Sequence, residues 1–60
     1  MSSVYNPEAD IMAEIERLEL EGREIRKRVE HAQNEADKRV LNKQLEELKQ
    51  QLEFLQAKLP

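Results

Sequence analysis

Residues 32–37, Ala32-Gln33-Asn34-Glu35-Ala36-Asp37, separate two runs of apolar residues and decide the fold of this 60-residue chain. Along each run the spacing alternates between four and three residues, the heptad pattern of a helix that packs one narrow stripe against another helix. The first run reads Ile11, Ile15, Leu18, Gly22, Ile25, Val29, Ala32 and Ala36, and the second reads Leu41, Leu45, Leu48, Leu52, Leu55 and Leu59. The step from Ala36 to Leu41 is five residues, so one straight helix cannot carry both runs on one face. The sequence therefore predicts an all-α antiparallel hairpin of two long helices.

Capping signals place the ends of both helices. Asn34 can cap the second helix, and Asn6 followed by Pro7 can cap the first; acidic residues follow each cap, where the helix dipole favours negative charge. We expect a flexible tail over residues 1–6 and a single hairpin over 7–59. Its first helix spans about 7–32, its turn about 33–36 and its second helix about 37–58. Gly22 lies in phase with the stripe, so the first helix should continue through it at a cost of about 1 kcal/mol relative to alanine.

The stripe residues also predict a register. Each pair sums to 70 in residue number: Ile11–Leu59, Ile15–Leu55, Leu18–Leu52, Gly22–Leu48, Ile25–Leu45 and Val29–Leu41. A register shifted by one heptad would pair Gly22 with Leu41 and leave Leu55 and Leu59 beyond the core. The alternative fold is one long helix in a coiled coil, since residues 23–59 contain neither glycine nor proline.

The small size of the chain predicts self-association. A monomer of this length buries only about 60% of its unfolded surface, and small folds usually need disulfides, a metal or a partner chain. The chain has no cysteine, so we expect the hairpin to pair into a dimeric four-helix bundle. Four apolar residues beside the stripe widen it toward that of a bundle core: Met12, Leu20, Val40 and Phe54. No apolar stretch approaches a membrane span and no secretory signal is seen, so a cytoplasmic protein without a membrane partner is expected.

No constellation of residues points to catalysis, and neither an enzyme nor a cofactor is expected. His31 is the single histidine and cannot form a zinc site of several His or Cys ligands, so we predict no metal site and no catalytic residue. The glutamates lie mainly off the stripe, where they favour solubility and spaced ion pairs such as Glu24 with Arg28 and Glu35 with Arg39.

Charge is ordered along the chain. Residues 1–22 carry a net charge of −5, residues 23–43 a net charge of +3, and residues 44–60 a net charge of −1. In a hairpin this order gives a basic turn end and an acidic open end. One interpretation is structural, because two hairpins in opposite directions would set each basic turn beside the acidic end of the other. The other is binding of nucleic acid or an acidic partner. Its candidate residues are Arg23, Arg26, Lys27, Arg28, Lys38, Arg39 and Lys43.

These observations favour a non-enzymatic, self-associating helical protein that acts as a protein–protein interaction or regulatory module. Its expected partners are a second copy of itself or another helical protein. The alternatives are a small RNA- or DNA-binding regulator that uses the basic turn end, and a coiled-coil oligomerisation scaffold.

Overall fold

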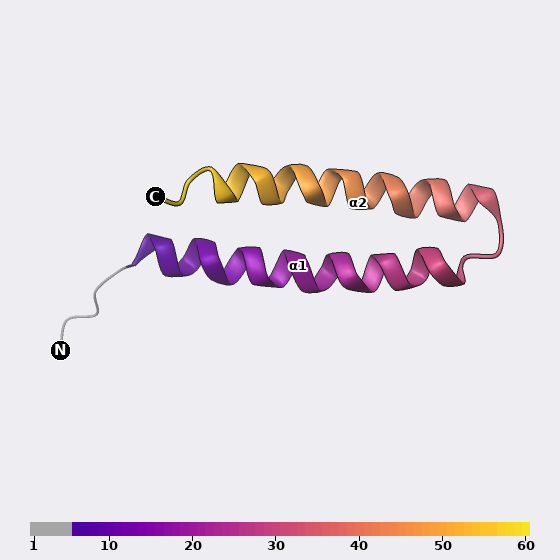
Figure 1. Ribbon diagram of the computed structural model, residues 1–60, viewed down its shortest axis with the longest axis horizontal. Coiled ribbons are helices and arrows are strands. Elements are labelled where there is room, and N and C mark those ends of the chain that lie inside the picture. Colours follow the sequence, from indigo (N-terminus) through magenta and orange to yellow (C-terminus); the bar gives the residue numbers. More distant parts are fainter. Residues whose placement is uncertain (1–5) are drawn as a thin grey trace.

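The computed structural model describes residues 6–60, which form two helices, α1 (Pro7–His31) and α2 (Glu35–Gln56). The helices lie side by side in opposite directions (Figure 1), so the predicted hairpin is confirmed and the chain is not the single long helix of the alternative. The tail expected over residues 1–6 lies outside the described residues, except for Asn6.

Both helices begin at the predicted asparagine caps. The side-chain oxygen of Asn6 accepts hydrogen bonds from the backbone N–H groups of Glu8 and Ala9, at 3.1 and 3.3 Å. The side-chain oxygen of Asn34 accepts one from the N–H of Asp37 at 2.8 Å. The backbone N–H groups in the first turn of a helix have no acceptor within the helix. The asparagine side chains supply acceptors for them, and these bonds therefore fix where each helix begins.

The turn is shorter than expected and uses extended backbone. Ala32 and Asn34 both have extended dihedral angles, and the described residues contain no positive φ angle. The chain therefore reverses over residues 32–34. Compared with the predicted bounds, α1 ends one residue earlier, and α2 both begins and ends two residues earlier. Ala36 consequently lies in the first turn of α2, where it is exposed and outside the stripe to which the sequence assigned it.

The core of the hairpin is the contact between the two stripes. Ile15, Leu18 and Ile25 of α1 and Leu48 of α2 are buried, and the leucines at 41, 45, 52 and 55 pack against them at partial exposure. α1 runs unbroken through Gly22, which is also buried. A methyl group added at Gly22 would lie 3.5 Å from Cδ2 of Leu48. This proximity confirms the register in which residue numbers sum to 70, and it excludes the pairing of Gly22 with Leu41.

The described residues form a single layer, two helices wide and one helix thick (Figure 1). Even its best-protected side chain, Leu18, keeps 4% of its surface exposed. Neither of the two described helices is long and apolar enough to cross a membrane.

Candidate interaction surfaces

The twelve stripe residues predicted to pair across the hairpin all lie along the contact between α1 and α2 or at its ends. Five are buried, namely Ile15, Leu18, Gly22, Ile25 and Leu48. The other seven are half-buried: Ile11, Val29, Leu41, Leu45, Leu52, Leu55 and Leu59. Five of these seven are leucines of α2 or its C-terminal extension, so the stripe of α2 is less completely buried than that of α1.

The hairpin has two broad faces, one on each side of the stripe, and different polar residues border the stripe on each face. We call the first the Gly22 face. Its shallow groove has a floor formed by Gly22, Leu45, Leu48 and Leu52. The groove is bordered by Glu19, Arg23, Arg26, Asn42, Glu46 and Lys49. The missing side chain of Gly22 opens this groove midway along the hairpin.

We call the opposite face the Arg17 face. Near the open end its groove is lined by Glu14, Arg17, Leu18, Glu47, Gln50, Gln51, Phe54 and Leu55. Glu21, Ile25, Gln44 and Leu48 continue it at mid-length, and Arg28, His31, Ala32, Asp37, Val40 and Leu41 line it near the turn. Helical spacing explains the division, since Glu21 and Arg23 flank Gly22 and project from opposite edges of the α1 stripe.

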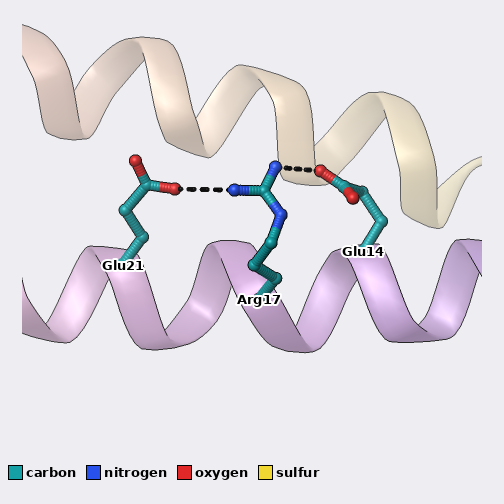
Figure 2. A network of polar contacts seen from close by, with 3 residues as sticks. All are labelled: Glu14, Arg17 and Glu21. Atoms are coloured by element: carbon teal, nitrogen blue, oxygen red, sulfur yellow. Dashed lines mark hydrogen bonds and ion pairs between the residues drawn. The ribbon is translucent and has the colours of Figure 1, made fainter.

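An ion-pair network on the Arg17 face links three residues of α1. The Arg17 guanidinium donates to the carboxylate of Glu14 and to that of Glu21, 3.4 Å away, as Figure 2 shows. The hydrogen bond from Arg17, together with its positive charge, lowers the pKa of the Glu14 carboxyl below its ordinary value of 4.5 and outweighs desolvation. The same hydrogen bond raises the pKa of Arg17. This network was not foreseen in the sequence, although the spacings of three and four residues are those at which helical side chains meet.

The structure does not gather the seven candidate basic residues on one surface. Arg26 lines the Gly22 face, whereas Arg28 lines the Arg17 face. Lys27 lies 3.8 Å from Glu24, and Lys38 lies 3.9 Å from Glu35. These glutamates thus contact the lysine three residues along, and the expected pairing with Arg28 and Arg39 is wrong. Arg23, Arg39 and Lys43 are exposed.

The four apolar residues beside the stripe are all more than half exposed, from Met12 at 54% to Phe54 at 63%. Val40 and Phe54 share the Arg17 face, where Lys58 Nζ lies 4.4 Å from the centre of the Phe54 ring. Leu20 lies on the outer side of α1, two residues from the stripe position Leu18. The four therefore do not extend one continuous stripe.

Residues 6–60 contain no group of three or more His, Asp or Glu side chains placed to hold a metal ion. His31 is exposed at the end of α1, beside Arg28 and Asp37. The surface of the described residues offers shallow grooves between the two helices.

Comparison of the chain with protein-family models, with curated proteins and with solved structures finds no match in any of the three.

Proposed function

We propose that this protein is a non-enzymatic helical module of the cytoplasm that works by pairing with a second copy of itself, forming a four-helix bundle that serves protein–protein interaction or regulation. The observation that carries the proposal is that residues 6–60 form a single layer of helices, in which four apolar side chains are buried. Domains are built from at least two packed layers, and a second hairpin would supply the second layer. The half-buried leucines of α2 offer the apolar surface for that contact.

The order of charge supports an arrangement with the two turns at opposite ends. The fold brings residues 23–31 and 35–43, which belong to the net-positive part of the sequence, to the turn end. If both turns lay together, these segments would repel each other; in the reversed pair each faces the acidic open end of the other copy. An exposed ion pair contributes only about 0–1 kcal/mol, so apolar burial drives association and charge selects its direction.

Sedimentation equilibrium over a range of protein concentrations tests self-association. We expect a dimer at micromolar concentration and a melting temperature that rises with protein concentration, because dimerisation stabilises the folded state by mass action. A folded monomer whose melting temperature does not depend on concentration would exclude the proposal.

Nucleic-acid binding is a second candidate, supported by the meeting of both basic segments at the turn end. Lys and Arg side chains neutralise phosphates, so binding would weaken steeply as salt is raised. A gel-shift series with duplex and hairpin RNA and DNA at low salt tests it. The charge-reversed pair Arg26→Glu and Arg28→Glu should abolish a shift while helix content is unchanged, and a wild-type chain that shifts no probe would dismiss this candidate.

A further inference from the structure

The two faces of the hairpin differ in how their charges would meet a second copy. On the Gly22 face, Glu19 and Arg26 border the groove on α1, and Glu46 and Lys49 border it on α2. Each pair consists of one acid and one base on the same helix, and the two residues lie on either side of the middle of the hairpin. The floor between them is apolar, and two of its leucines, Leu45 and Leu52, are only half-buried.

The midpoints of these two pairs lie at one level of the hairpin. The midpoint of Glu19 and Arg26 falls between residues 22 and 23, and that of Glu46 and Lys49 falls between residues 47 and 48. Gly22 faces Leu48 in the folded chain. A twofold axis that crosses the face at this level, from α1 toward α2, therefore relates both pairs at once.

Such an axis makes the face complementary to itself. It reverses the second hairpin, places α1 on α1 and α2 on α2, and brings Glu19 of each copy to Arg26 of the other. It likewise brings Glu46 of each copy to Lys49 of the other. It also sets Arg23 of each copy beside its own counterpart, so four acid–base contacts form against one contact of like charge. In a closed twofold dimer every contact forms twice, so one acid–base pair on each helix is sufficient to define the register.

At the level of Gly22 the Arg17 face lacks this property. At the same level Glu21 and Glu47 line one groove. A reversed copy would set Glu47 against its own counterpart and Glu21 against Glu24 of the second chain. Arg17, the base nearest to Glu21 on this face, is already shared between Glu14 and Glu21 (Figure 2). Carboxylates would therefore crowd together, which disfavours self-pairing of this face in that register.

We infer that the Gly22 face is the surface on which a second copy of this chain docks, with its direction reversed and its register set by Glu19–Arg26 and Glu46–Lys49 contacts. The inference rests on the proposed self-association and names the surface that it uses.

Charge exchange between positions 19 and 26 tests the inference. Glu19→Arg alone, or Arg26→Glu alone, replaces both attractions on α1 by repulsions, so each variant should dimerise about tenfold more weakly than the wild type. A mixture of the two variants should form a heterodimer, because every 19–26 contact between unlike chains is again attractive. The double variant Glu19→Arg/Arg26→Glu should recover the wild-type dimer. Recovery in these two samples also shows that each substitution leaves the hairpin folded.

The matched control lies on the other face at the same spacing. Glu21→Arg and Arg28→Glu should leave the dimer dissociation constant, measured by sedimentation equilibrium at low ionic strength, within about threefold of the wild type, since both residues lie on the Arg17 face, away from the assigned contact. Weakening by these controls and not by the first pair would assign the dimer to the Arg17 face. A dimer indifferent to Glu19→Arg and Arg26→Glu would overturn the assigned surface alone, whereas a monomeric wild-type chain would overturn the proposed function itself.

Discussion

The side chain of Asn34 holds the start of α2 through two hydrogen bonds to one residue. Its oxygen accepts from the Asp37 N–H at 2.8 Å, and its amide nitrogen donates to the Asp37 carboxylate at 3.1 Å. Replacing Asn34 by alanine removes both bonds and should lower the free energy of unfolding by about 1 kcal/mol. Urea denaturation followed by circular dichroism measures the loss. Gln33→Ala, an exposed neighbour in the same turn, is the control and should leave the transition unchanged; equal effects of the two variants would contradict a capping role.

The Glu14–Arg17 contact makes a pH-dependent prediction. The folded-state pKa of Glu14 is lowered by its hydrogen bond to Arg17, so the contact stabilises the fold above the ordinary carboxyl pKa of 4.5. That contribution should be lost as the pH falls through the lowered pKa, because the protonated carboxyl no longer favours the folded state. A nuclear magnetic resonance titration should find a lower midpoint for the Glu14 carboxyl in the wild type than in an Arg17→Gln variant. Identical midpoints would mean that the pair does not persist in solution.

Sequence predicts caps better than it predicts surface ion pairs. Asn6 and Asn34 could be identified because a cap depends on a residue type and on its nearest neighbours. The partners of Glu24 and Glu35 could not be identified, since bases three and four residues along are both within reach and differ little in free energy.

At the scale of the helices, Leu48 is the residue on which packing depends most. It is the one buried apolar residue of α2 among the described residues, and it covers the space beside Gly22. Truncating Leu48 to alanine should destabilise the fold by about 2–5 kcal/mol, because the cavity left opposite a glycine has no side chain to fill it. Thermal and urea unfolding would measure this loss. Leu20→Ala removes the same atoms from an exposed site and should cost well under half as much; similar losses would show that Leu20 is covered in the assembled protein.

The pairing of the helices follows from the sequence because both stripes step by matching intervals from a common centre. The proximity of Gly22 to Leu48 agrees with the register predicted from these intervals. The sequence predicts the ends of the turn less accurately. A turn of extended residues carries no glycine signal, and Ala36 fits the spacing of the first stripe although it lies in α2. The two faces become distinct only once the register is known, so the sequence alone did not separate Arg26 from Arg28.

At the scale of the whole molecule, the order of charge along the chain and the position of Gly22 both bear on the relative direction of two hairpins in the proposed dimer. The net-positive segments meet at the turn end, which favours a reversed partner over a parallel one. Screening shortens the reach of these charges to about 10 Å at 0.1 M salt and to about 3 Å at 1 M. The preference for the reversed arrangement should therefore weaken as salt is added, while the apolar contact itself persists.

A single introduced cysteine can report that arrangement, because the chain has none of its own. In the reversed dimer the twofold axis passes between Gly22 and Arg23, so the two copies of residue 23 face each other across it. Their Cα atoms would then lie within the roughly 4.4–6.8 Å that a disulfide requires. Arg23→Cys should thus yield a disulfide-linked dimer under mild oxidation at low salt, and more slowly at high salt. Glu21→Cys, on the other side of Gly22, projects to the opposite face and should remain largely unlinked. If both turns lay at one end, residue 23 would lie over α2 of the other copy, and the two cysteines would be too far apart to form a disulfide. Slow linking of Arg23→Cys in a protein that is dimeric by sedimentation would therefore exclude the reversed arrangement on this face.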